Sequence, residues 1–367
     1  MTSKQRFQAV MNRQLPDRLP ADMLWPRSET LRDLRNHFKT DSDETVLRKL
    51  GVDFRWVGCG EKYPEFEKKC NREMVGDTPG AGKRYIFHDD RTFEDEWGIV
   101  HRIGSDGKYL EWRGGPLVDK ESIGDWQPPQ MVLPSADAIR ASWASIKEYV
   151  LIGVVTMPFK IAWHVASYEY FLAQMALDPE FVETIYERIY AFETAKAVRM
   201  AEAGADVIAI VGDIAGSNGP MFSVNMFERF DLLRFQKMVD TIRAANPTVK
   251  ILYHSDGLLE PFIPALIKCG IDILNPIESN CMDPADIKRK FGEQLAFHGA
   301  ISVQKTIPNG TVADVKNEVN ERIRTVGYNG GYIVSNENSF PYNAPLENVL
   351  AIYEAVQAFD YASLRNG

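Results

Sequence analysis

The chain has 367 residues, of which 45% are hydrophobic and 25% charged, and its formal net charge is -9. This composition is typical of a folded globular protein and excludes a disordered chain. Nucleic acid is not expected as a partner, because its binding depends on clustered lysine and arginine rather than on a net negative charge.

The N-terminal segment and the cysteines indicate a cytoplasmic protein. Residues 1–16 are polar and include Lys4, Arg6 and Arg13 without an apolar core, so we expect neither a signal peptide nor a membrane-spanning helix there. No later apolar run is long enough to cross a bilayer, so no membrane association is expected. The four cysteines show no CxxC spacing, as expected of reduced thiols.

Eight runs rich in branched and aromatic residues predict strands, and helical segments lie between most of them. Short apolar strands that alternate with helices are typical of a parallel sheet, and eight such units predict a closed (β/α)8 TIM barrel in the α/β class. The alternative is an open doubly wound sheet, but no GxGxxG turn follows any strand. The predicted strands are 18–24, 52–58, 149–155, 205–213, 250–256, 271–277, 295–301 and 330–335.

The interval 59–135 departs from this alternation. It contains charged and aromatic segments with the hairpin signal Asp106-Gly107, where a tight turn needs the positive φ that these residues tolerate. We therefore expect one barrel domain over 1–367, with 59–135 as an antiparallel β insertion after the second strand. Because βα loops form the active-site face of a barrel, this insertion is expected to lie over that face.

Catalytic residues of a TIM barrel come from the C-terminal ends of different strands, so polar residues at these ends are the first candidates. These candidates are Arg27 after the first strand, Asp213 after the fourth, His254 and Asp256 after the fifth, Glu278 after the sixth, and Glu337 and Asn338 after the eighth.

His254 and Asp256 point to the same side of an extended chain, because side chains alternate with a period of two. Together with Glu278 or Glu337 they could ligate a divalent metal such as zinc, or form a histidine base oriented by a carboxylate. Two structural alternatives remain open: His254 as a strand-end histidine without function, and Asp256 as the N-cap of a helix that begins at Leu258.

Asp213 follows an apolar run, where desolvation favours the neutral carboxyl and suits it to proton transfer or to binding a substrate N–H. Its alternative role is to accept backbone N–H groups in the loop 216–219. His298, near the end of the seventh strand, and Trp163, after the third, are candidates for substrate binding together with Arg27. For His298 and Trp163 the alternative is packing in the core.

Several motifs in this order resemble the uroporphyrinogen decarboxylase superfamily: GADVIAIVGDIAGSNGP, KILYHSDGLLEPFIPALIKCGIDILNPIE, FHGAISVQ and APLENVLAIYEA. The resemblance runs from about Leu15 to the C-terminus and implies a (β/α)8 barrel. It also implies one of two chemistries, cofactor-free decarboxylation of uroporphyrinogen or zinc-assisted methyl transfer that involves a corrinoid protein. The segment DEWGIVHR resembles the methyltransferase-like branch.

The departures from the superfamily patterns favour methyl transfer. Decarboxylases carry an arginine-rich RQAGR signature after the first strand, whereas LWPRSETLRDLR has only Arg27 near the strand end, which is poorly suited to a substrate with eight carboxylates. The methyltransferases hold zinc through a His-x-Cys pair and a later Cys. Asp256 and Asn338 stand where these cysteines would be, and Asn338 also stands where decarboxylases place a histidine. A thiolate substrate would require softer ligands than these, so the resemblance implies an oxygen- or nitrogen-linked methyl group.

Three hypotheses follow. The first is the methyltransferase component of a corrinoid-dependent system, which moves a methyl group between a small O- or N-methylated substrate and a corrinoid protein. In it, His254 and carboxylates hold zinc, Asp213 shapes the substrate pocket, and a homodimer is possible. The second is a metal-free decarboxylase that uses Asp213 and Arg27. The third is a non-catalytic module that binds a corrinoid protein.

Overall fold

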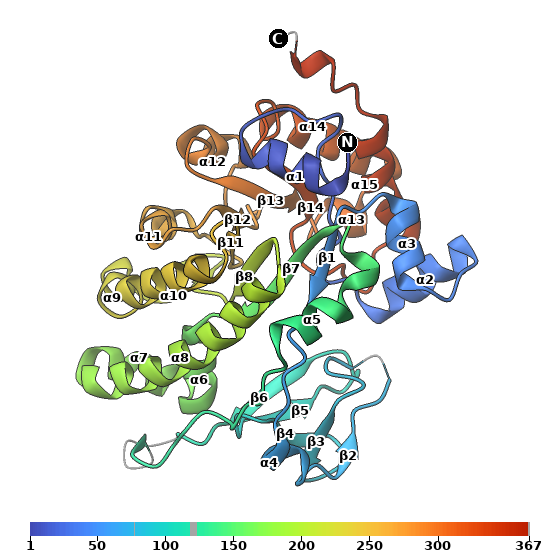
Figure 1. Ribbon diagram of the computed structural model, residues 1–367. Coiled ribbons are helices and arrows are strands. Elements are labelled where there is room, and N and C mark those ends of the chain that lie inside the picture. Colours follow the sequence, from blue (N-terminus) through green and yellow to red (C-terminus); the bar gives the residue numbers. More distant parts are fainter. Residues whose placement is uncertain (77, 118–122, 366–367) are drawn as a thin grey trace.

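Seven parallel strands form the central sheet of the computed structural model, which describes residues 1–76, 78–117 and 123–365. The strands are buried almost throughout, as expected of parallel strands covered by helices. Figure 1 shows the sheet curled at the centre of the molecule, with the long helices around it. In spatial order the strands are β1 (Phe54–Val57), β7 (Val150–Thr156), β8 (Val207–Val211), β11 (Lys250–His254), β12 (Ile273–Asn275), β13 (Ala296–Ile301) and β14 (Tyr332–Asn336).

The first of the eight predicted strands, 18–24, is reduced to a single bridge between Ala21 and Val334. Pro20 has no N–H to give to a ladder, and the N–H of Ala21 donates to the Asp53 side chain at 3.0 Å instead of to a neighbouring strand. The segment still joins the two edges of the sheet. Val334 donates to the Pro20 carbonyl at 3.0 Å, and Asp53 donates to the Ala21 carbonyl at 2.8 Å. The TIM-barrel prediction is therefore confirmed, with one irregular member.

Helices cover the outside of the sheet, and glycines follow the last residues of several of them. The longest, α8, ends at Gly204 and α11 ends at Gly270, both in the left-handed conformation that glycine adopts easily. None of the helices in the described ranges is both long and apolar enough to cross a membrane. The helices are α1 (Ser3–Met11), α2 (Ser28–Phe38), α3 (Asp43–Leu50), α4 (Pro64–Glu67), α5 (Ala136–Ser142), α6 (Pro158–Ala166), α7 (Tyr168–Leu177), α8 (Pro179–Ala203), α9 (Val224–Phe230), α10 (Leu232–Ala245), α11 (Ile263–Cys269), α12 (Pro284–Phe291), α13 (Thr306–Asn309), α14 (Val312–Thr325) and α15 (Leu346–Ala358).

The antiparallel insertion after β1 is confirmed and forms a second sheet, visible below the barrel in Figure 1. A small core of Met74, Tyr85 and Phe93 supports it. The hairpin predicted from Asp106-Gly107 joins the last two strands, and Gly107 has a φ of +73°. Positions 77 and 118–122 of the predicted insertion lie outside the described residues. Its strands are β2 (Arg72–Glu73), β3 (Arg84–Phe87), β4 (Thr92–Glu94), β5 (Val100–Ile103) and β6 (Leu110–Gly114).

Candidate functional site

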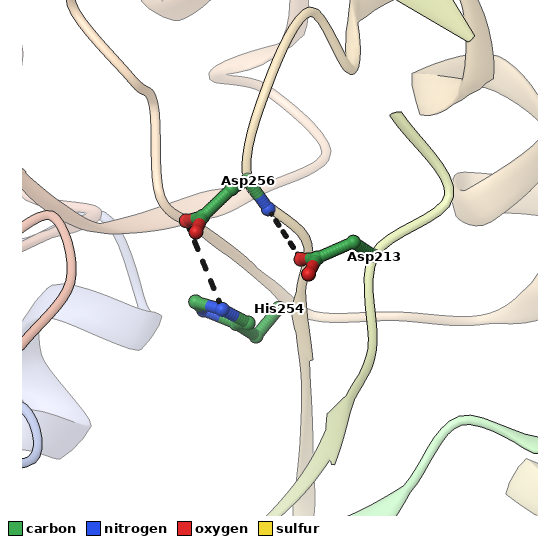
Figure 2. Close-up of side chains that lie close together, drawn as sticks. All are labelled: Asp213, His254 and Asp256. Carbon is green, nitrogen blue, oxygen red and sulfur yellow. Dashed lines mark hydrogen bonds and ion pairs between the residues drawn. The ribbon is translucent and has the colours of Figure 1, made fainter. Parts of the chain in front are cut away.

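Three predicted side chains, Asp213, His254 and Asp256, meet at the C-terminal ends of β8 and β11 (Figure 2). One ligand atom from each lies within 4.8 Å of the others. His254 is buried, with its Nε2 at 3.8 Å from Asp256 Oδ1, whereas the Asp256 side chain is 36% exposed. The three residues are called the His-Asp-Asp group below.

Neighbouring strand ends fix the turn that carries this group. The N–H of Asp256 donates to Asp213 Oδ1 at 2.9 Å, and the N–H of Gly257 donates to Glu278 Oε2 at 2.7 Å. Gly257 has a φ of +88°, and a Cβ at this position would lie 2.5 Å from the carbonyl oxygen of Gly216. A glycine is therefore required for the chain to turn here, and the turn presents both aspartates to His254.

Both alternative roles proposed for the aspartates are wrong. The helical turn after β11 begins at Glu260, with Leu259 as its N-cap and no capping side chain, so Asp256 does not cap it. Asp213 accepts the N–H of Asp256 and does not order the loop 216–219. The Asp213 carboxylate instead contacts the Asp256 backbone, and the Asp256 carboxylate lies beside His254 and Asn338.

The surroundings of Asp256 disfavour its negative charge. Burial, together with the nearby carboxylates of Asp213 and Glu278, raises the pKa of this carboxyl to about 6, against the opposing effects of His254 and the Asn338 amide. Asn338 donates from Nδ2 to Asp256 Oδ2 and so orients the carboxylate. A cluster of acidic groups that lacks a compensating cation is well suited to bind one.

The donor set of the His-Asp-Asp group fits a divalent metal. One imidazole nitrogen and two carboxylates are ligands that zinc accepts, and three protein ligands leave a coordination position for a substrate. Of the described residues, no cysteine belongs to this group. The nitrogen and oxygen donor atoms of this group are therefore harder ligands than the sulfur atoms of a thiolate site.

Glu278 and Glu337, the other predicted metal ligands, lie beside the group and not in it. Both oxygens of Glu278 accept hydrogen bonds, from the N–H of Gly257 at 2.7 Å and from Gln304 Nε2 at 2.6 Å. Glu337 accepts the N–H of Ser279 at Oε1, at 2.7 Å, whereas its buried Oε2 has no hydrogen-bond partner. Burial raises the pKa of Glu337 to about 7.

A cavity of about 270 Å³ opens beside Asp256. Glu278, Glu337 and Asn338 line it from the loops after β12 and β14, and Tyr109 lines it from the insertion. The lining therefore contains three carboxylates against the single guanidinium of Arg27.

Arg27 borders the cavity, but other groups already engage its guanidinium. Its Nε donates to the Phe340 carbonyl at 2.9 Å and its Nη1 donates to the Tyr342 hydroxyl at 2.6 Å. The Tyr342 hydroxyl in turn donates to the Lys108 carbonyl at 2.9 Å. Arg27 thus connects the loop after β14 to the insertion hairpin.

His298 and Trp163 are not among the residues that line the cavity. His298 is fully buried, with Nε2 at 2.9 Å from Asp22 Oδ2, so it lies inside the barrel and not at its mouth. Trp163, on α6, stacks on His164 with ring centroids 3.6 Å apart. These two side chains therefore do not border this cavity, and their contact with a substrate stays a prediction.

Three residues that contact His254, or that lie behind His298, were not among the site residues predicted from the sequence. Asn275 Oδ1 lies 2.5 Å from His254 Nδ1, and the Trp25 ring packs against the imidazole with centroids 4.7 Å apart. Asp22 lies behind His298. Asn275 and Asp22 could have been found by the criterion that selected His254, because each is a polar residue within or at the end of a predicted apolar strand.

Comparison with known proteins agrees with this architecture. The family model described as uroporphyrinogen decarboxylase (URO-D) matches residues 62–359. A methyltransferase structure from Methanosarcina mazei superposes with a TM-score of 0.69 and 17% identity, covering 97% of this chain and 98% of that one. At this identity the superposition establishes the fold.

Two curated relatives are methyltransferases. The methylated-thiol–coenzyme M methyltransferase of Methanosarcina mazei is 24% identical over 330 residues, which are 86% of this chain and 78% of that enzyme. The methylcobamide:CoM methyltransferase MtaA of Methanosarcina barkeri is 25% identical over 206 residues, or 56% of this chain, and the match spans only 57% of that enzyme. Because the family model covers most of the chain, the protein belongs to the uroporphyrinogen decarboxylase family, which contains decarboxylases and methyltransferases.

Proposed function

We propose that the chain is the methyltransferase component of a corrinoid-dependent system and moves a methyl group between a small O- or N-methylated substrate and a corrinoid protein. The observation that carries this proposal is the His-Asp-Asp group beside the 270 Å³ cavity. A divalent metal such as zinc would be held by His254, Asp213 and Asp256. When bound, it would polarise the heteroatom that carries the methyl group.

The residues of the chain prepare the site for this reaction. Asn338 orients the Asp256 carboxylate, and the Trp25 ring covers one side of the His254 imidazole and keeps water from it. Tyr109 of the insertion borders the cavity in which the substrate would lie. The corrinoid protein would approach this same face, because the C-terminal ends of the strands carry the His-Asp-Asp group.

The chemistry of the donor set supports an oxygen or nitrogen leaving group. The relatives named for coenzyme M act on sulfur compounds, and a sulfur ligand is best matched by a soft, cysteine-rich metal centre. The His-Asp-Asp group has nitrogen and oxygen donors alone. A metal in this harder environment would interact more favourably with an ether or amine.

The acidic lining of the cavity argues against decarboxylation of a polycarboxylate. Three carboxylates face the cavity against Arg27, whose guanidinium already binds Phe340 and Tyr342. A substrate with several negative charges would be repelled there.

Elemental mass spectrometry on protein purified without a histidine tag tests the metal site. We expect near-stoichiometric zinc in the wild type and its loss in His254→Ala. The control is His88→Ala, which removes a histidine whose side chain is 47% exposed on the insertion. Wild-type protein that binds no divalent metal, even after zinc is added, would contradict the proposal.

A methyl-transfer assay with a corrinoid protein then tests the reaction. We expect methylation of the corrinoid from O- or N-methylated donors by the wild type and none by His254→Ala. Metal binding and corrinoid-protein binding without transfer from any donor would favour the non-catalytic module. Release of carbon dioxide from a carboxylic acid by metal-free protein would favour the decarboxylase.

A further inference from the structure

A continuous chain of buried hydrogen bonds extends from His254 into the centre of the barrel. Asn275 links two histidines: its Oδ1 lies 2.5 Å from His254 Nδ1 and its Nδ2 lies 2.7 Å from His298 Nδ1. Behind them, His298 Nε2 lies 2.9 Å from Asp22 Oδ2. All four side chains are at most 3% exposed, so water does not offer them alternative partners.

The backbone determines the orientation of the Asn275 amide. Nδ2 also donates to the carbonyl oxygen of His298 at 3.0 Å, and a carbonyl oxygen can only accept. Rotating the amide by 180° would place two acceptors against each other at this contact. The Nδ2 group therefore faces His298, and Oδ1 faces His254.

This orientation fixes the proton on both imidazoles. Because Oδ1 of Asn275 only accepts, His254 must carry a proton on Nδ1, so the lone pair of the neutral imidazole is on Nε2, which faces Asp256. Because Nδ2 of Asn275 donates to His298 Nδ1, His298 must carry its proton on Nε2 and donate it to Asp22. The two histidines are thus held in opposite tautomers by one amide.

Asp22 is the last residue of this series of hydrogen bonds, at the end opposite His254. Its Oδ2 accepts from Trp56 Nε1 at 2.9 Å as well as from His298, so it acts as an acceptor for two donors. An amide does not relay protons. This series of hydrogen bonds therefore fixes which nitrogen of each imidazole is the donor, and it does not conduct a proton.

We propose that Asn275 is a positioning residue that, with His298 and Asp22 behind it, locks His254 in the tautomer whose Nε2 can bind a metal. This inference rests on the proposed function, because it assigns to Asn275 a role in preparing the His-Asp-Asp group. Hydrogen bonds to the non-ligating nitrogen of a metal-binding histidine typically change metal affinity by about 10- to 100-fold.

The test combines nitrogen NMR of the imidazoles with zinc titration. Metal-free protein labelled with ¹⁵N at its six histidines gives one pair of ring-nitrogen signals per histidine. His254→Ala and His298→Ala assign the two pairs of interest by their disappearance. We expect the wild type to show His254 protonated at Nδ1 and His298 protonated at Nε2.

Asn275→Ala removes the amide, and Asn348→Ala is the matched control. Asn348 is equally buried, and its Nδ2 donates only to the carbonyls of Ile307 and Gly310 on α13 and in the loop after it. We expect Asn275→Ala to lose the single His254 tautomer and about 10- to 100-fold in zinc affinity, whereas Asn348→Ala keeps both.

Each outcome decides between the two proposals. A wild-type His254 protonated at Nε2, or a tautomer unchanged in Asn275→Ala, would overturn this inference even if zinc binds. Opposite tautomers in a protein that binds no zinc would leave the inference standing and overturn the proposed function. If Asn275→Ala fails to fold, the wild-type spectrum alone still tests the tautomers.

Discussion

Glu337 allows a quantitative test of how the acidic site affects stability. Its side chain is 1% exposed, Oε1 accepts the N–H of Ser279, and the buried Oε2 has no hydrogen-bond partner. Burial raises its pKa from 4.5 to about 7. The change that tests this is Glu337→Gln, which keeps an acceptor for Ser279 and cannot ionise.

The sign of the effect follows from the raised pKa. The folded protein holds the Glu337 proton up to about pH 7, whereas the unfolded chain releases it near 4.5, so folding stability falls as the pH rises between these values. At about 1.4 kcal/mol for each pH unit, the full loss is about 3 kcal/mol. About 2.5 kcal/mol of it falls between pH 5 and pH 8.5.

Urea unfolding followed by tryptophan fluorescence, with a chelator present, measures this difference. We expect Glu337→Gln to be more stable than the wild type by about 3 kcal/mol at pH 8.5 and by less than about 1 kcal/mol at pH 5. Glu293→Gln, at an exposed position, is the control and should change neither value by more than about 0.5 kcal/mol. A stability difference between Glu337→Gln and the wild type that does not change with pH would refute the reasoning.

Two further substitutions test the turn after β11 and a buried ion pair. Gly257→Ala should lower the free energy of unfolding by at least about 2 kcal/mol more than Gly204→Ala, because both have a positive φ but no atom lies within 4 Å of a Cβ at Gly204. Equal losses in urea unfolding would show that the close approach at Gly257 is relieved without cost. Lys196→Met should cost about 3–5 kcal/mol, because Lys196 Nζ lies 3.4 Å from the Glu193 carboxylate, which is 1% exposed. Lys316→Met, which breaks an exposed pair, should cost less than about 1 kcal/mol, and a similar cost for both lysines would contradict this expectation.

The sequence predicted the strands well because parallel strands in a barrel are continuous apolar runs with clear ends. Seven of the eight predicted runs overlap a strand of the central sheet, with the strand ends within a few residues of the prediction. The remaining run, around Ala21, pairs at one residue, because Pro20 lacks an N–H and the Asp53 side chain binds the N–H of Ala21. The periodicity of the sequence does not encode a side chain from another strand that replaces a backbone partner.

The candidate site was predicted in part. His254, Asp256 and Asp213 were found because each ends an apolar strand, and strand ends of a barrel converge. Glu278 also ends a strand, but its carboxylate turns back to bind Gly257 and Gln304. Strand ends can be read from a sequence, whereas the conformations of the loops that follow depend on hydrogen bonds between segments far apart in the chain.

The buried partners of His254 were missed for a different reason. Asn275 contacts His254 from the neighbouring strand, where the two residues are in register, and Asp22 contacts His298 from a segment 276 residues away in the sequence. A single polar residue in an apolar run gives no indication of which strand it faces. Strand pairing brings Asn275 to His254, and closure of the barrel by the segment around Ala21 brings Asp22 to His298.

The segment around Ala21 closes the barrel by pairing with β14 at a single residue, and it also carries residues that support the candidate site. Ala21 supplies the only backbone bridge between its segment and β14 in the described chain, and beyond it the Asn336 side chain takes over by pairing with the N–H and carbonyl of Leu24. The same short segment carries Asp22, which ends the buried hydrogen-bond chain, and Trp25, which covers His254.

Few hydrogen bonds therefore hold residues 20–25 against β14 and keep the barrel closed there. Releasing residues 20–25 would detach Asp22 from His298 and uncover His254, while the seven-stranded sheet kept its own hydrogen bonds. Such local opening requires less free energy than global unfolding. If this segment opened locally, the protein would lose its prepared site while remaining folded, and the amide protons of Asp22 and Val334 would exchange before those of the central strands.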